Sequence, residues 1–315
     1  MARLGTTFSQ IQCKYLKIDY KETLKAILTL PLEYIRVCAY WNEIEPQPGQ
    51  FNFTILDDII STISKTDKKI VLAVGMKSPR WPEFHFPDWV KQKCDTKLAH
   101  IPIDTQTELS SAAFNFISAV ISRYKDNHSI SYLQIENEAF NNFSFTHNKF
   151  VSYSFVRRAV ILARTLCPEK KILLSNAINL APFDWRREYS SAFEKNLTIA
   201  DAIGVNVYTK VPVNKQYYAH PTIFFWWRLS KWRKQMQKLG IESWITEAQS
   251  EPWEYKSAVH TDKKEYPSAS PQRTKSLINK LDKIGYQVIL LWGCEYWYWS
   301  KLQGRNDWWK GVESL

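Results

Sequence analysis

The chain has 315 residues, a hydrophobic fraction of 45% and a formal net charge of +11 at pH 7. This length suits one large domain, since an α/β barrel commonly uses about 250 residues. The hydrophobic fraction is ordinary and supports a sizeable core, and no run approaches the roughly 18 apolar residues of a membrane-spanning helix. The basic surplus suits a polyanionic partner but does not require one.

The cysteines are five in number, widely spread, and without a C-x-x-C pair: Cys13, Cys38, Cys94, Cys167 and Cys294. This pattern argues against a disulfide framework or a zinc site and favours a reducing compartment. The N-terminus lacks the apolar stretch of a signal peptide. We therefore expect a cytoplasmic protein with no metal and no cofactor.

Strands and helices alternate from the N-terminus. Short apolar runs predict strands at residues 4–9, 34–40 and 70–75, and the last of these is continuously apolar, as in a strand buried on both faces. Apolar residues at helical spacing predict helices around residues 24–28 and 56–63. A loop rich in proline and aromatic residues follows, and a long helix is predicted around residues 109–121.

The alternation continues through the second half of the chain. It predicts strands at 130–135, 172–175, 201–208, 243–246 and 287–292, with helices near 147–166, 222–238 and 277–284. No repeat, linker or charge block divides the sequence. Eight strands alternating with helices predict an α/β fold, a single (β/α)8 TIM barrel over residues 1–315. Because the last helix has little chain left to draw on, we expect it to be abbreviated.

Two of the predicted strands end in carboxylates. The fourth is followed by Glu136, Asn137 and Glu138, and the seventh by Glu247. A buried strand does not need acidic residues at its C-terminal end, whereas that end carries the catalytic groups of α/β barrels. Alternation along the strand would place Glu136 and Glu138 on one face. A solvated strand end would explain one such motif, but two of them favour a functional site.

Four segments in this order resemble the retaining glycoside hydrolases of clan A, similar to families 5, 35, 39 and 42. Residues 36–53 are similar to their second strand and the following loop, and residues 134–138 to the acid/base motif of the family 35 β-galactosidases. Residues 245–247 are similar to the nucleophile strand of families 5 and 39. Residues 291–299 resemble the eighth-strand segment that supplies a tryptophan platform.

The resemblance implies cleavage of β-linked glycosides or oligosaccharides by double displacement through a glycosyl-enzyme intermediate. Glu138 would be the acid/base and Glu247 the nucleophile, with carboxyl groups about 5–5.5 Å apart. Asn137 would contact the 2-hydroxyl of the sugar. Arg36 and Tyr208 would hold the nucleophile, and a nearby arginine favours the charged carboxylate.

Three more residues are candidates for substrate binding through the same resemblance. Trp292, at the end of the eighth predicted strand, would be the sugar platform. Glu295 and Trp297 follow Gly293, beyond which the strand register is open, so each could face either the substrate or the core.

The predicted helix 222–238 has two features that point to different environments. An apolar stripe predicts a face turned to the core: Phe225, Leu229, Trp232 and Met236. Additional aromatic residues lie beside five cationic ones and also suit a helix on an anionic membrane: Phe224, Trp226 and Trp227.

An alternative function is therefore a non-catalytic barrel that binds an anionic glycan, a lipid surface or nucleic acid through its basic face. Binding alone does not require Glu138 and Glu247, which favour an enzyme with a carbohydrate substrate. No nucleic-acid partner is expected, because charge alone points to one and no binding module accompanies it. Peripheral membrane contact stays open, and the sequence does not specify an oligomeric state.

Overall fold

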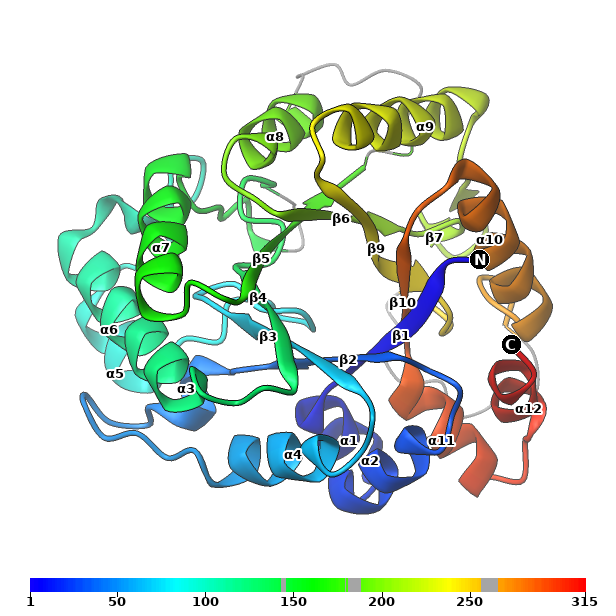
Figure 1. Cartoon of the computed structure of the whole chain (residues 1–315), viewed down its shortest axis with the longest axis horizontal. Helices are drawn as coiled ribbons and strands as arrows, with labels where there is room; N and C mark the ends of the chain where they lie inside the picture. The colour runs from blue at the N-terminus through cyan, green and yellow to red at the C-terminus, as the bar shows by residue number, and fades with distance from the viewer. Residues whose placement is uncertain (143–145, 179, 181–187, 256–265) are drawn as a thin grey trace.

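Eight parallel strands close into a barrel in the computed structural model, which describes residues 1–142, 146–178, 180, 188–255 and 266–315 (Figure 1). The strands are β1 (Arg3–Phe8), β2 (Tyr34–Cys38), β3 (Lys69–Val74), β4 (Ile130–Ile135), β5 (Lys171–Ala177), β6 (Ala202–Val207), β9 (Glu242–Gln249) and β10 (Val288–Trp292). Pairing of β1 with β10 closes the ring, with Arg3 opposite Val288. The predicted (β/α)8 barrel is confirmed.

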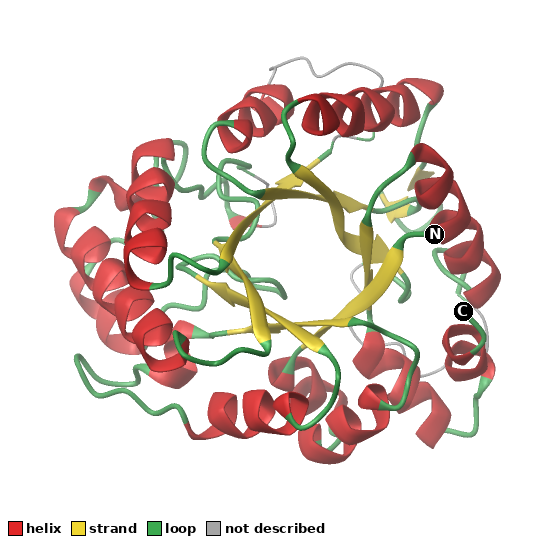
Figure 2. Ribbon diagram, viewed as in Figure 1, coloured by secondary structure: helices red, strands yellow, loops and turns green. Residues whose placement is uncertain are grey.

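Helices surround the barrel on all sides (Figure 2). They are α1 (Gln10–Leu16), α2 (Tyr20–Leu28), α3 (Trp41–Ile44), α4 (Thr54–Ser64), α5 (Asp88–Lys93), the 3₁₀ helix η1 (Ile103–Thr105), α6 (Thr107–Tyr124), α7 (Tyr153–Leu166), α8 (Glu188–Leu197), α9 (Ile223–Lys238), α10 (Pro271–Ile284), α11 (Cys294–Leu302) and α12 (Asp307–Glu313). A small hairpin of β7 (Val211–Pro212) and β8 (Tyr218–Ala219) precedes α9. None of the helices in the described part of the chain has the length and hydropathy that crossing a membrane requires.

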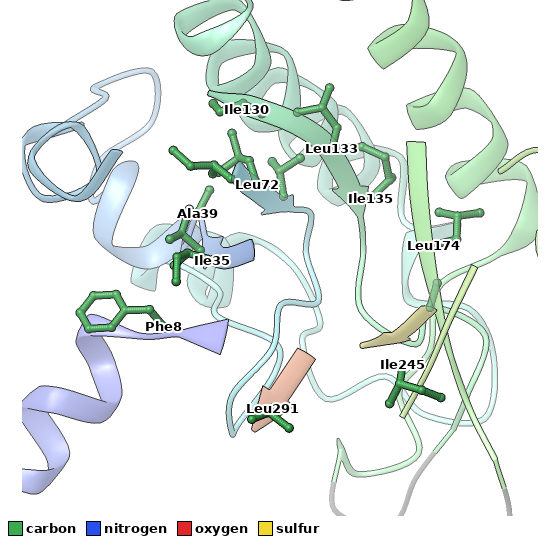
Figure 3. Packing of buried hydrophobic residues seen from close by; sticks show 14 of the residues in the cluster. Phe8, Ile35, Ala39, Leu72, Ile130, Leu133, Ile135, Leu174, Ile245 and Leu291 are labelled. Atoms are coloured by element: carbon green, nitrogen blue, oxygen red, sulfur yellow. The ribbon is translucent and has the colours of Figure 1, made fainter. Parts of the chain in front are cut away.

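The main core lies between the strands and the surrounding helices (Figure 3). Ile35, Leu72 and Leu133 come from successive strands and are buried in it. The predicted stripe of α9 is buried as well, which confirms its core-facing side: Phe225, Leu229, Trp232 and Met236. Helix α7 begins later than the predicted residue 147, because the Ser152 side chain caps it by accepting a bond from the Phe155 N–H.

The interior of the barrel holds a separate aromatic layer. Tyr34, Tyr132 and Trp244 pack edge to face there, with the Trp244 ring 5.0 Å from Tyr34 and 4.6 Å from Tyr132. Side chains on a strand alternate, so the inward positions that follow Tyr34 and Tyr132 are Arg36 and Gln134. The apolar layer therefore ends where a buried polar network begins.

The closing unit consists of two short helices. Helix α11 starts directly after β10, and the turn between them places Gly293 at φ 123°. A Cβ at Gly293 would lie 2.4 Å from the Cβ of Glu251, so the close approach of these two loops requires glycine. The predicted abbreviated last helix thus takes the form of α11 and α12.

Candidate active site

Glu247 is aimed into the barrel by an irregularity of β9. Ile245 pairs with Val205 of β6, and Glu247 pairs with Asn206, so Thr246 is the extra residue of a β-bulge. Strict alternation from the inward-facing Trp244 would have placed Thr246 inside. The bulge shifts the alternation by one residue and turns the Glu247 side chain toward Arg36.

The Glu247 carboxylate accepts one strong bond on each oxygen. Arg36 Nη2 donates to Oε1 at 3.1 Å, and the Tyr208 hydroxyl donates to Oε2 at 2.6 Å. Burial and the charge of Glu247 raise the pKa of Tyr208 well above its usual range, so the phenol keeps the proton that it donates. Charge-assisted bonds of this kind stabilise a carboxylate in its charged form.

Arg36, on β2, donates hydrogen bonds to side chains of β1, β4 and β9 beneath the site. Its side chain has no exposed surface, and its remaining nitrogens donate to Thr7 Oγ1 and Gln134 Oε1, each at 2.9 Å. A buried guanidinium needs such partners, because an unpaired charge is costly to bury. The expected pairing of Arg36 and Tyr208 with Glu247 is present in the structure.

Glu138 reaches the site from the turn after β4. Its backbone has φ 46°, an uncommon conformation for a residue other than glycine, and the Ser175 hydroxyl accepts a bond from its N–H at 2.8 Å. Its carboxyl is buried, and Asn206 Nδ2 donates to Oε1 at 2.8 Å.

Asn206 links the two glutamates. Besides its bond to Glu138, its Oδ1 accepts a bond from Thr246 Oγ1 at 2.6 Å, immediately before Glu247. Thr246 can come this close because Gly204 faces it, where a Cβ would lie 2.1 Å from Thr246 Cγ2. One amide on β6 thus fixes the ends of β4 and β9 relative to each other.

The surroundings of Glu138 disfavour its charged form. Burial raises the pKa of this carboxyl well above its usual range, and the negative charges of Glu83 and Glu247 raise it further. Lys77 and the bond from Asn206 act in the opposite direction without cancelling these effects. The Lys77 ammonium is buried, pairs with Glu83 Oε2 at 3.1 Å and donates to the carbonyl oxygen of Glu138 at 3.1 Å.

Asn137 follows β4 and is held by side chains of β4 and β5. Its Oδ1 accepts bonds from Ser175 Oγ at 3.0 Å and Gln134 Nε2 at 3.2 Å. Within the described ranges no side chain or carbonyl accepts a bond from its Nδ2. This orientation leaves the amide nitrogen as the donor that a sugar hydroxyl could use.

Glu136 does not share a face with Glu138, contrary to the alternation expected for a strand. Strand β4 ends at Ile135, and Glu136 adopts φ 57°, so the chain turns there. Its carboxylate accepts bonds from the N–H groups of Met76 and Lys77 at 2.8 and 2.7 Å. It also lies against Gly75, where a Cβ would come within 2.4 Å of the carboxyl carbon. Glu136 therefore fastens the loop after β3 to the turn after β4.

The opposite side of the barrel mouth carries a buried ion cluster. Arg80 Nη1 and Nη2 contact Glu251 and Glu295, each at 2.6 Å, and the guanidinium lies 4.1 Å from the centroid of the Trp292 ring. The Ser9 N–H also donates to Glu295 at 2.5 Å. Trp292 is thus held in place at the end of β10, whereas Glu295 has no exposed surface and its carboxylate is occupied by protein groups. The structure makes Glu295 a support for Arg80 and not a substrate contact.

Trp297, a candidate for either the substrate or the core, is a core residue and not a substrate contact. It has no exposed surface, and its Nε1 donates to the carbonyl oxygen of Ser250 at 2.6 Å. The substrate contact is excluded by the register: the chain enters α11 at Cys294, so strand alternation does not extend beyond Gly293.

Several residues of the site were not predicted from the sequence: Lys77, Arg80, Glu83, Ser175 and Asn206. Asn206 had a usable signal, since it is a polar residue in the otherwise apolar strand 202–207. Lys77, Arg80 and Glu83 lie in the loop after β3, where no periodicity in the sequence indicates which way a side chain points.

In the described part of the chain, no cluster of His, Cys, Asp or Glu side chains is arranged to hold a metal ion.

A family model described as beta-galactosidase, that of glycosyl hydrolase family 42, matches residues 17–163. The beta-galactosidase BgaH of Haloferax lucentense is 28% identical over 114 residues, which cover 34% of this chain and 17% of that protein. The family-model match includes the turn after β4 that carries Glu138, and it ends before β9 and Glu247.

Solved structures resemble the chain over most of its length. A beta-galactosidase from Halorubrum lacusprofundi matches 92% of this chain and 52% of its own with a TM-score of 0.61 and 13% identity. Xylanase 10B from Thermotoga maritima matches 93% of this chain and 83% of its own, with a TM-score of 0.59 and 13% identity. The chain spans about half the length of the beta-galactosidase structures that it matches. The predicted resemblance to the clan A glycoside hydrolase barrels is confirmed.

Proposed function

We propose that the chain is a retaining glycoside hydrolase in which Glu247 is the nucleophile and Glu138 the acid/base. The observation that carries this assignment is the contrast between the two carboxyl groups. Glu247 receives a guanidinium and a phenol, which stabilise its charge, whereas burial and neighbouring charges favour a protonated Glu138. A pair of carboxyls in opposite protonation states is what double displacement uses.

The first step forms a covalent intermediate. The Glu247 carboxylate attacks the anomeric carbon while Glu138 gives its proton to the departing glycosidic oxygen, so an ester bond forms as the glycosidic bond breaks. In the second step the Glu138 carboxylate takes a proton from water, and the resulting oxygen nucleophile displaces Glu247. Two inversions at one carbon give net retention.

The remaining polar groups orient the two glutamates and the sugar. Asn206 holds the Glu138 carboxyl near the end of β9, and Arg36 holds Glu247 over the interior. Asn137 Nδ2, which has no acceptor among the described residues, would donate to the 2-hydroxyl, and the edge of Trp292 that stays exposed at the end of β10 would contact the sugar. The non-catalytic alternative does not account for this division of roles between two carboxylates.

For the substrate we propose β-galactosides first and β-xylosides second. The family model and the first curated relative are described as beta-galactosidases, and xylanases are among the similar folds. Both are β-linked sugars, so a panel of aryl β-glycosides tests the class and the sugar together.

The test compares Glu138→Ala with Glu136→Gln, its neighbour in the same turn. Glu138→Ala should lose at least about 100-fold in kcat/KM on an alkyl galactoside, whose leaving group needs a proton. It should keep most of its kcat/KM on a dinitrophenyl galactoside, whose leaving group needs no proton, but its second step should be slow. Added azide should speed that step and yield a glycosyl azide, because azide needs no general base. Glu136→Gln should show no azide product, because its carboxylate binds backbone amides.

Two results would contradict the proposal. If Glu138→Ala loses kcat/KM equally on both substrates and gives no azide product, another group donates the proton. If the unaltered protein cleaves none of the aryl β-glycosides, the proposed activity itself is wrong.

A further inference from the structure

Most of the chain's surplus positive charge lies on two helices. Helix α9 carries five cationic side chains and no acidic one, and α10 carries four against the single carboxylate of Asp282. The two helices together have a net charge of +8, out of +11 for the whole chain.

These helices lie side by side on the outer wall of the barrel (Figure 1). The Lys280 ammonium of α10 lies 3.6 Å from the centroid of the Trp226 ring of α9, and Arg233 Nε donates to the Gly285 carbonyl at 3.1 Å. The two basic helices therefore adjoin, and we call the outer surface that they share the α9–α10 face.

The outward side of α9 also exposes large apolar groups. Ile223 is 79% exposed and Trp227 61% exposed, and the outward positions that follow are Lys231, Lys234 and Lys238. Their spacing of three and four residues places them on one side of the helix, opposite its buried stripe. Lys231 lies 5.4 Å from the Trp227 ring, so the apolar and cationic groups adjoin.

We infer that the α9–α10 face is a docking surface for an anionic lipid bilayer. Seven of the nine cationic side chains are exposed and complement a negatively charged leaflet, and each basic residue near such a surface strengthens binding. The exposed apolar residues decide between a bilayer and a soluble polyanion. Burial of an isoleucine and an indole in the interface between headgroups and acyl chains removes apolar surface from water and stabilises binding. A nucleic acid or an acidic glycan offers an isoleucine no such apolar environment.

This orientation leaves the proposed active site open. Glu138 and Glu247 lie at the C-terminal ends of the strands, and the α9–α10 face lies on the side wall. A barrel lying on its side on the membrane would keep its mouth free for a substrate at the surface. The Trp226 and Lys280 contact between the helices would stay intact.

The test measures co-sedimentation of the full chain with vesicles of phosphatidylcholine, alone or with 30% phosphatidylserine. The first variant is Lys231→Gln with Lys234→Gln. Its matched control is Lys14→Gln with Lys65→Gln, two exposed lysines on α1 and at the end of α4, across the barrel from α9. Each lysine near the surface contributes roughly fivefold in the partition coefficient, so the α9 variant should bind about 30-fold more weakly at low salt.

The control variant should bind about as well as the unaltered chain, and Ile223→Ser should lose about tenfold. Hydrolysis of a soluble aryl glycoside should be unchanged in all three variants, which shows that each is folded. The inference is overturned if both double variants bind equally, or if neutral vesicles bind as tightly as anionic ones. It is equally overturned if heparin or DNA binds and anionic vesicles do not.

Discussion

Replacing Arg36 by methionine should destabilise the fold through Glu247. The guanidinium is buried, and its loss would leave the Glu247 carboxylate, only 7% exposed, with the Tyr208 hydroxyl but without its cation. Removing one partner of a buried ion pair typically costs about 3–5 kcal/mol. A loss of this size should lower the melting temperature by about 10 °C in a chain of this length.

The second variant in this experiment also removes the negative charge of Glu247, which Arg36→Met leaves buried without a cation. In Arg36→Met with Glu247→Gln, the amide no longer carries the charge that makes burial costly, so much of the lost stability should return. Denaturant unfolding of the two single variants and the double variant gives a coupling free energy, which we expect to be at least about 2 kcal/mol. If the two losses simply add, Arg36 stabilises the barrel through Thr7 and Gln134 and not through Glu247.

Three further predictions concern the surroundings of the site. Glu83→Gln removes a negative charge beside Glu138, so the pKa of Glu138 should fall and the alkaline limb of the kcat/KM profile should move to lower pH; an unmoved limb would mean that Glu138 does not set it. Gly75→Ala should lower the free energy of unfolding by about 1–3 kcal/mol, because the new methyl group meets the Glu136 carboxylate, and equal stability in denaturant would contradict this packing. Trp297→Phe should destabilise the chain to a similar degree by removing a buried hydrogen bond, with KM unchanged, whereas a raised KM would restore its predicted role at the substrate.

The barrel could be predicted because each buried strand is a short apolar run, and because helices alternate with these runs. The pairing of Arg36 and Tyr208 with Glu247 followed from the resemblance together with the cost of burying an unpaired arginine. In both cases the information is local: the residues that matter lie at the ends of recognisable strands.

The directions of the other side chains at the site depend on backbone turns and bulges, which produce no periodic pattern in the sequence. Positive φ angles at Glu136 and Glu138 send two neighbouring carboxylates in different directions, and the bulge at Thr246 turns Glu247 inward. The start of α11 immediately after Gly293 removed Trp297 from the mouth of the barrel. The bulge shifts the register of β9 by a single residue, which is enough to reverse where a side chain points, and the other two changes end the strand pattern altogether.

The most direct test of the central claim is to identify the residue that carries the sugar. A 2-deoxy-2-fluoro galactoside with a good leaving group should inactivate the protein by trapping the ester intermediate. Trypsin separates the two candidates, because Glu247 lies in the peptide of residues 239–256 and Glu138 in that of residues 126–149. Tandem mass spectrometry should place one fluorosugar on Glu247. A label on Glu138 or another residue, or turnover that yields the inverted sugar, would contradict the assignment.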